Sequence, residues 1–165
     1  MLVIGIDPGT ASTGYGLIRQ SQNNQLELVD YGLISTAAGR PMPARLLDIY
    51  SALSDVLERY QPDSAAVEQI FFQRNVKTAL MVGQARGVAL LSLAKMEVTV
   101  DEYTPSEIKL AVSGYGNADK NQMQTMVKAL LKMDHLPKPD DAADALAVAI
   151  CHCHSYKLRH LGEDT

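Results

Sequence analysis

Four acidic residues sit at the ends of apolar segments, where a folded chain rarely places a carboxylate without a partner. An apolar run at the N-terminus leads straight into Asp7, and a shorter run leads in the same way into Glu68. Asp141 and Asp144 open the last apolar segment, 140–156. If that segment packs beside the two strand ends, four oxygen-rich side chains converge, and a hard divalent cation would make the cluster tolerable. The fold must therefore bring distant parts of the chain to one acidic site.

Size and cysteine content indicate one ordinary domain. The chain has 165 residues, 47% of them hydrophobic, which is enough to bury a core without disulfides. Cys151 and Cys153 are two apart on a predicted helix, so their side chains point about 200° apart and cannot pair with each other. We expect a reduced, intracellular protein with a single domain over 1–156 and a polar tail over 157–165.

Targeting and membrane signals are not expected. The N-terminus has no basic segment, and Asp7 interrupts its apolar run within a few residues, so we expect no signal peptide. The other apolar stretches contain Gly, Gln and Arg and fall short of a membrane span. The sequence therefore favours a cytoplasmic location without membrane contact.

Hydrophobic periodicity predicts an α/β fold. Short bounded runs predict strands over 2–7, 13–19, 26–36, 64–68 and 97–103. Helical spacing predicts helices over 43–60, 75–94, 105–112, 119–132 and 140–156. Thr104 precedes a Pro and lies three residues before a Glu, which is the pattern of a capping box. Three successive strands followed by alternating helices and strands indicate a mixed central sheet flanked by helices.

The predicted helix over 75–94 has two unusual features. Its second half is apolar nearly all round, which predicts burial on more than one side. The surrounding segment 69–96 also contains cationic residues and no acidic residue: Arg74, Lys77, Arg86 and Lys95. The net charge of −4 argues mildly against a protein that coats nucleic acid, but this segment is locally cationic. Its cations can face phosphates, or they can form a solvated helix face.

Each acidic residue also has a structural explanation. Asp141 and Asp144 are three apart, about 60° from each other on one side of a helix, and acids in a first turn complement the helix dipole. Asp7 could stabilise a turn, and Glu68 could pair with a nearby cation. Capping explains Asp144 less well, because Ala, Leu and Val surround it. The concurrence of all four favours an oxygen-ligand site for Mg²⁺ or Mn²⁺ rather than zinc.

Such a site predicts phosphodiester hydrolysis. Two divalent ions about 4 Å apart can activate a water and stabilise the leaving oxygen. Phe71 follows Glu68 closely, and an exposed aromatic there would stack on an unpaired base, although it could also belong to the core. The candidate phosphate contacts are Arg74, Lys77, Arg86, Lys109 and Lys120.

The run 151–154, Cys-His-Cys-His, resembles a zinc motif but does not predict one. Four consecutive residues on a helix fan around its axis and cannot meet at one tetrahedral ion. We therefore expect no zinc site there.

Four blocks of the sequence, in this order, resemble the RuvC family of bacterial Holliday junction resolvases. They are Ile4-Gly5-Ile6-Asp7-Pro8-Gly9, Val67-Glu68-Gln69-Ile70-Phe71, Gly83-Gln84-Ala85-Arg86-Gly87 and Asp141-Ala142-Ala143-Asp144-Ala145-Leu146. The resemblance implies an RNase H-like fold and a homodimer. It also implies paired, symmetric, Mg²⁺-dependent nicking of opposed strands in four-way junction DNA during recombination and repair.

The resemblance also implies roles for individual residues. The catalytic acids and metal ligands would be Asp7, Glu68, Asp141 and Asp144, holding two Mg²⁺ per active site, with Mn²⁺ as a substitute. Phe71 would stack at the junction, and Lys109 and Lys120 would contact DNA. The apolar helix after Asn75 would form the dimer, and the RuvA–RuvB branch-migration complex would be a partner.

Three other functions fit parts of the sequence. An actin-like ATPase or sugar kinase shares the Asp-Pro-Gly-Thr turn at residues 7–10, but it needs a second domain for which 165 residues leave no room. Another RNase H-like nuclease acting on RNA or flap DNA would share the acids, and a non-cleaving scaffold would bind junctions only. Because the chain is acidic overall, we expect DNA binding that weakens sharply with salt.

Overall fold

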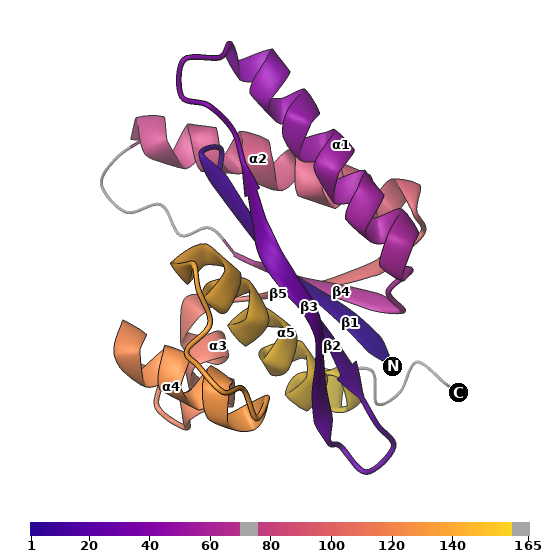
Figure 1. The fold of residues 1–165 in the computed structure, drawn as a ribbon, viewed down its shortest axis with the longest axis vertical. Coiled ribbons are helices and arrows are strands. Elements are labelled where there is room, and N and C mark those ends of the chain that lie inside the picture. The colour runs from indigo at the N-terminus through magenta and orange to yellow at the C-terminus, as the bar shows by residue number, and fades with distance from the viewer. Residues whose placement is uncertain (70–75, 160–165) are drawn as a thin grey trace.

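The chain forms one five-stranded sheet in a computed structural model that describes residues 1–69 and 76–159 (Figure 1). The strands are β1 (Leu2–Asp7), β2 (Ser12–Gln20), β3 (Leu26–Ser35), β4 (Ser64–Glu68) and β5 (Thr99–Tyr103). Their order across the sheet is β3-β2-β1-β4-β5. β1, β2 and β3 pair antiparallel, whereas β4 lies parallel to both β1 and β5. The predicted meander and mixed sheet are therefore confirmed.

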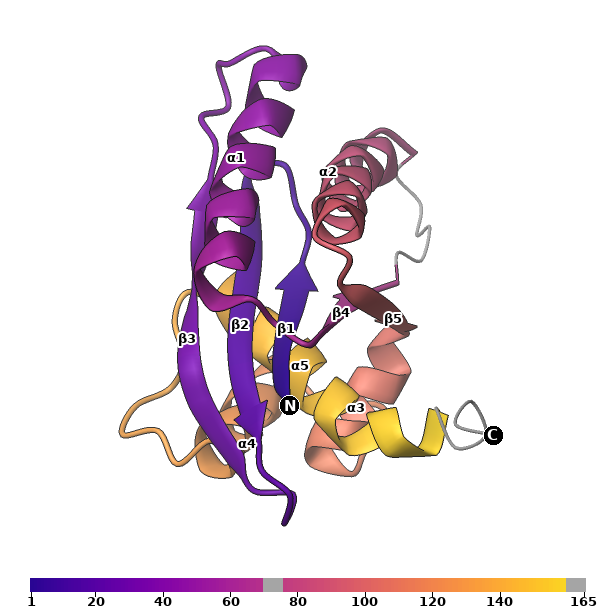
Figure 2. The ribbon, with the colours of Figure 1, turned by 90° about the vertical axis from the view of Figure 1, so that its right-hand side faces the viewer.

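Helices cover both faces of the sheet. They are α1 (Met42–Tyr60), α2 (Val76–Lys95), α3 (Pro105–Ser113), α4 (Lys120–Leu130) and α5 (Asp140–Arg159). Figure 2 shows α1 and α2 on one side of the sheet, with α3, α4 and α5 on the other. Within the described ranges, no helix combines the length and apolar character needed to cross a membrane.

Alternation along the strands explains the two layers. Ile4 and Ile6 belong to the core under α1 and α2, whereas Val3 belongs to the core under α3, α4 and α5. Successive strand side chains point to opposite faces, so a central strand that is buried on both faces is apolar throughout. By the same alternation, Asp7 emerges on the α5 side of the sheet.

The predicted elements are all present, and their boundaries differ for local reasons. β5 begins at Thr99 rather than at residue 97, because Glu97 has a left-handed φ of 56° and belongs to the turn that ends α2. The predicted capping box forms: the Thr104 side chain accepts from Glu107 N, and the Glu107 carboxylate accepts from Thr104 N. α5 continues to Arg159, three residues past its predicted end. The division into a domain over 1–156 and a tail over 157–165 stays a prediction.

The expectation that α2 is buried on more than one side is wrong within this chain. Leu80 is 64% exposed and Leu91 is 55% exposed. A Cβ placed on Gly83 or Gly87 would meet nothing within 4 Å. These four residues, here called the α2 stripe, repeat at helical spacing along one side of α2. The side toward α1 and the sheet, which carries Ala85, is buried.

α5 packs directly on the backbone of β1 and β2, because glycines remove the side chains between them. A Cβ on Gly5 would lie 2.2 Å from the Ala145 carbonyl oxygen. A Cβ on Gly14 would lie 2.0 Å from the carbonyl oxygen of Asp141, and one on Gly16 would also clash with α5. Real Cβ atoms do not make such contacts, so any side chain here would push α5 away from the sheet. The start of α5 therefore lies beside the end of β1.

Replacing Gly5 with Ala should force α5 off the sheet. We expect Gly5→Ala to lower the free energy of unfolding by about 3 kcal/mol, because backbone rather than a flexible side chain stands in the way. The measurement is the urea midpoint at an unchanged m-value. Gly39→Ala is the control, since an added Cβ there meets nothing within 4 Å. Equal midpoints for the two variants would contradict the packing described.

Candidate active site

Asp7 and Glu68 leave the sheet side by side. β1 and β4 are parallel and Ile6 pairs with Val67, so the next residue of each strand is acidic at the same edge. The carboxyl ends of parallel strands are common sites for functional groups in α/β folds. The sheet register thus places two predicted residues together from separate parts of the chain.

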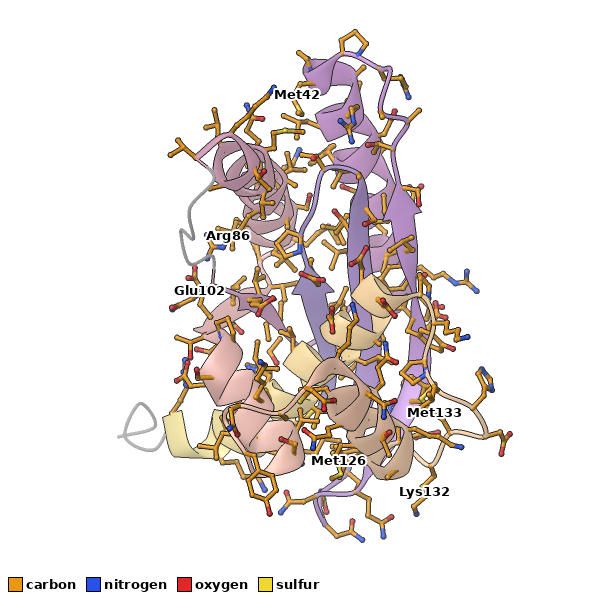
Figure 3. The ribbon with its side chains drawn as sticks, turned by 90° about the vertical axis from the view of Figure 1, so that its left-hand side faces the viewer. Met42, Arg86, Glu102, Met126, Lys132 and Met133 are labelled. Atoms are coloured by element: carbon orange, nitrogen blue, oxygen red, sulfur yellow. The ribbon has the colours of Figure 1, made fainter. Side chains whose placement is uncertain are left out.

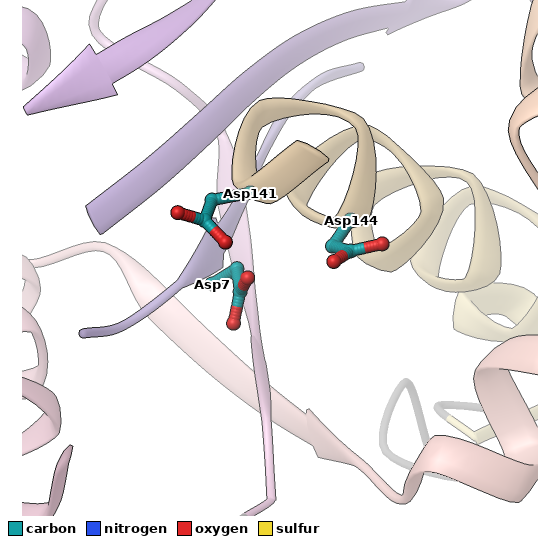
Figure 4. Close-up of side chains that lie close together, drawn as sticks. All are labelled: Asp7, Asp141 and Asp144. Atoms are coloured by element: carbon teal, nitrogen blue, oxygen red, sulfur yellow. The ribbon is translucent and has the colours of Figure 1, made fainter. Parts of the chain in front are cut away.

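The N-terminal turns of α5 add Asp141 and Asp144 to this edge. One carboxylate oxygen from each of Asp7, Asp141 and Asp144 lies within 4.8 Å of the others. In Figure 4, Asp141 and Asp144 project from the start of α5 beside Asp7 at the end of β1. At an effective dielectric constant of about 20, two ionised carboxylates at this separation repel by about 3 kcal/mol. The fold therefore holds three mutually repelling groups in one place.

Glu68 lies next to this group but outside it. Among the described residues, the set that meets the mutual 4.8 Å distance contains the three aspartates and not Glu68. The prediction of one four-acid cluster is thus correct for the aspartates and too tight for Glu68. Glu68 lines a cavity of about 290 Å³ together with Asp144, and burial, followed by the negative charge of Asp144, raises the pKa of Glu68. Glu68 and Asp144 therefore share one side of the site.

Burial and mutual repulsion disfavour the ionised forms of these acids. Burial, followed by the charges of Glu68, Asp144 and Asp141, raises the pKa of Asp7 from 3.8 to about 7. Burial is also the main cause of the raised pKa values of Glu68 and Asp144. Strongly perturbed carboxyl groups at one strand edge are typical of functional sites.

The donor set fits a hard divalent cation. The three grouped side chains offer only carboxylate oxygens, which suit Mg²⁺ or Mn²⁺ and not zinc. The charge of Lys120 opposes part of the rise in the pKa of Asp7 and Asp144, but its ammonium pairs with Asp140 at 2.9 Å. The positive charge nearby thus offsets only part of the repulsion, and a bound cation would relieve the rest.

Ser12 is a site residue that the sequence did not reveal. Its hydroxyl donates a hydrogen bond to Asp141 Oδ2. The adjacent Thr13 hydroxyl donates to the Gly9 carbonyl at 2.8 Å and closes the turn after Asp7. A hydrogen bond from a neighbouring residue orients a candidate ligand. No pattern around Ser12 distinguishes it from an ordinary first residue of a strand.

The predicted cationic contacts have separate environments. Lys109 and Lys120 line the cavity that also contains Glu68 and Asp144, as expected for groups near a phosphate. Lys77 is exposed on α2.

Arg86 is engaged in an ion pair with Glu102, 2.6 Å between Nη2 and Oε2, and Figure 3 shows the two residues close together. Its buried Nε has no hydrogen-bond partner within the described residues. Arg86 is therefore not a free cation on this surface. Phe71 and Arg74 lie outside the described residues.

The Cys-His-Cys-His run forms no metal cluster among the residues that the structure describes. Cys151 and Cys153 are buried free cysteines, and burial raises the pKa of both thiols. His152 is fully buried, whereas His154 is exposed. Consecutive side chains on α5 thus have different surroundings, which is the expected helical geometry.

Comparisons with known proteins agree with the predicted resemblance. Residues 3–152 match the family model described as crossover junction endodeoxyribonuclease RuvC. The chain is 55% identical over 155 residues to the Chloroflexus aurantiacus protein of that name, covering 94% of each chain. It is equally identical to the Desulfitobacterium hafniense protein of that name over 158 residues, covering 96% of this chain and 95% of the relative.

Solved structures give the same result. The fold matches Thermus thermophilus RuvC in complex with Holliday junction substrate with a TM-score of 0.91 and 33% identity, covering 96% of both chains. The yeast mitochondrial Holliday junction resolvase Ydc2 matches with a TM-score of 0.70 at 14% identity, which supports the fold alone. The predicted RNase H-like fold is confirmed.

The raised pKa of Asp7 makes the stability of the metal-free protein depend on pH. Folded Asp7 keeps its proton up to about pH 7, whereas unfolded Asp releases it near 3.8, so the folded state binds more protons between these values. Stability should therefore fall as pH rises from about 4 to about 7, by roughly 3 kcal/mol from this group. This loss of stability can be measured as the melting temperature in EDTA at a series of pH values, where each kcal/mol corresponds to roughly 2–4 °C.

Asp7→Asn is the control for this dependence. Asn cannot ionise, so the variant should lose this part of the slope and be more stable than the wild type above pH 7. Added Mg²⁺ should stabilise the wild type more at pH 8 than at pH 5. Parallel curves for the two proteins in EDTA would show that Asp7 titrates normally.

Proposed function

Because this chain belongs to the RuvC family of crossover junction endodeoxyribonucleases, we propose that it resolves Holliday junctions. The reaction is paired, symmetric hydrolysis of phosphodiester bonds in opposed strands of four-way junction DNA. The observation that carries the proposal is the meeting of Asp7, Asp141 and Asp144 beside Glu68 at one edge of the sheet. That arrangement supports metal-dependent hydrolysis better than binding alone.

We assign the metal ligands to Asp7, Glu68, Asp141 and Asp144, with two Mg²⁺ per site and Mn²⁺ as a substitute. Divalent cations supply an activated water and stabilise the leaving oxygen of an in-line displacement. Asp7, Asp141 and Asp144 would hold an ion together, and Glu68, which lines a cavity with Asp144, would complete the donor set for two ions. Ser12 holds the Asp141 carboxylate in place.

The DNA backbone would approach over the cavity next to the acids. Lys109 and Lys120 flank this cavity, so their ammonium groups can neutralise phosphates adjacent to the one that is cleaved. Phe71 is proposed to stack on an unpaired base, and Arg74 and Lys77 to contact the backbone. Arg86 would have to exchange its ion pair with Glu102 for a phosphate, so its contribution is the weakest of the set.

We propose that the α2 stripe (Leu80, Gly83, Gly87 and Leu91) forms the homodimer interface. Exposed leucines separated by glycines let a second helix approach closely and bury apolar area. A two-fold dimer presents two active sites in a symmetric arrangement, which paired cleavage of opposed strands requires. The RuvA–RuvB complex is the proposed partner at the junction. A cytoplasmic location is consistent with two buried free cysteines.

Asp7→Asn should abolish cleavage and leave junction binding intact. The neutral amide keeps the shape of Asp7 but removes a central charge of the metal site, so we expect at least a 100-fold loss of rate. Mobile and immobile four-way junctions are incubated with each protein, with and without Mg²⁺, and nicks are mapped. Symmetric nicks by the wild type should depend on Mg²⁺, and gel shifts in EDTA should be equal for both proteins.

Two outcomes would contradict the proposal. Equal cleavage of flap DNA or an RNA–DNA hybrid would indicate another RNase H-like nuclease. Junction binding without nicking by the wild type in Mg²⁺ would indicate a scaffold.

Charges on the α2 stripe should separate the dimer. The double substitution Leu80→Glu and Leu91→Glu places negative charges of both copies in the proposed α2–α2 interface, where they repel. We therefore expect a monomer in light scattering at micromolar concentrations. Leu110→Glu is the matched control, because Leu110 is similarly exposed, at 59%, but lies on α3. Uncoupled single nicks should replace paired cleavage in the double variant. An unchanged dimer would place the interface elsewhere.

A further inference from the structure

A buried histidine on α5 connects the acidic helix to two strands. His152 Nε2 lies 2.9 Å from the Ser64 hydroxyl at the start of β4. His152 Nδ1 lies 3.0 Å from the Tyr103 hydroxyl on β5 and 3.5 Å from Asp101 Oδ2. The imidazole is fully buried, and the rings of Tyr103 and Tyr156 meet it edge-on. We call His152, Ser64 and Tyr103 the α5 lock.

The α5 lock and the acidic site occupy opposite ends of the same pair of elements. Ser64 begins β4 and Glu68 ends it, while His152 lies eight residues after Asp144 on α5. α5 therefore runs opposite to β4, and each spacing corresponds to about 12–13 Å. Any sliding of α5 at the lock moves Asp144 relative to Glu68 by the same amount, because a helix is stiff along its axis.

A further buried hydrogen bond supports the lock from β2. The Gln20 side-chain amide donates to the Cys153 carbonyl at 2.9 Å, next to His152. The first half of α5, in contrast, rests mainly on glycine backbone and on apolar contacts, with the hydrogen bond from Ser12 to Asp141 at its start. Most of the hydrogen bonds between the described parts of α5 and the sheet thus lie toward the C-terminal half of α5.

We propose that His152 is a positioning residue for the metal site, acting through the axial placement of α5. Apolar packing is non-directional, whereas hydrogen bonds at both ring nitrogens to two different strands favour one axial position of the helix. The α5 lock therefore sets the distances from Asp141 and Asp144 to Asp7 and Glu68. This inference depends on the proposed metal centre and adds residues that never touch the metal.

The test separates positioning from stability. In the triple variant Ser64→Ala, Tyr103→Phe, His152→Leu, every member of the lock becomes apolar, so no member retains an unpaired polar group and stability can recover. We expect a melting temperature close to that of the wild type and a roughly tenfold weaker affinity for Mn²⁺, measured by electron paramagnetic resonance without DNA. The half-saturating Mg²⁺ concentration for junction cleavage should rise in parallel, with junction binding in EDTA unchanged.

Cys153→Ala is the control for general destabilisation of α5. Cys153 is buried on the same helix, so its truncation should lower the melting temperature while Mn²⁺ affinity stays at the wild-type value. Wild-type Mn²⁺ affinity in the triple variant would overturn the proposal. If the triple variant does not fold, Ser64→Ala and Tyr103→Phe each remove one hydrogen bond of His152, and unchanged Mn²⁺ affinity in both would overturn it equally.

Failure of the proposed function gives a different result. A wild-type protein that binds Mn²⁺ and does not nick junctions would refute resolvase activity and leave the positioning role intact. A wild-type protein that binds no Mn²⁺ would refute the metal centre and the role of the α5 lock together.

Discussion

The contact between α5 and the bare backbone of β1 and β2 determines the rest of the structure. Gly5, Gly14 and Gly16 let the helix approach so closely that a single methyl group would clash with it. This close approach brings Asp141 and Asp144, at the start of α5, next to Asp7 at the end of β1, so that the three carboxylates form one group. Ordinary side chains at these strand positions would hold the helix farther from the sheet, and the carboxylates would stay apart.

The same contact brings negatively charged side chains together. The arrangement that a metal site requires therefore lowers the stability of the metal-free fold. Apolar packing of α5 against the sheet supplies the free energy that holds Asp7 next to Asp141 and Asp144 despite their repulsion. Burial, followed by the charges of the neighbouring acids, raises the pKa of Asp7 in this arrangement. A bound divalent cation would relieve the repulsion and favour the ionised forms, so metal binding and the stability of the fold would be coupled. The contribution of Asp7 to the stability of the metal-free protein is consequently lowest at and above neutral pH, where its carboxylate is ionised and can bind a metal.

The sequence was sufficient to predict the features that depend on hydrophobic periodicity and on where strands and helices end. Asp7 and Glu68 were predicted as site residues because each one ends a strand. Asp144 was predicted because its neighbours on α5 are apolar. The sequence could not predict the offset of Glu68 from the aspartates, which depends on sheet twist and on the exact height of α5. The hydrogen bond from Ser12 and the α5 lock also arise from tertiary contacts between residues far apart in the chain. Local sequence patterns do not determine the distances between residues that lie far apart in the chain.

The acidic net charge is compatible with DNA binding because charge acts locally. At physiological ionic strength the screening length is about 8 Å, so a phosphate senses the nearest side chains rather than the total of −4. Near the acidic site those side chains include Lys109 and Lys120, which border the cavity. Asp140 holds Lys120 at 2.9 Å without burying it, so the ammonium stays available while its position is restricted. A few phosphate contacts of this kind would give modest affinity, and recognition would then come from the shape of the junction and from the two-fold symmetry of the proposed dimer.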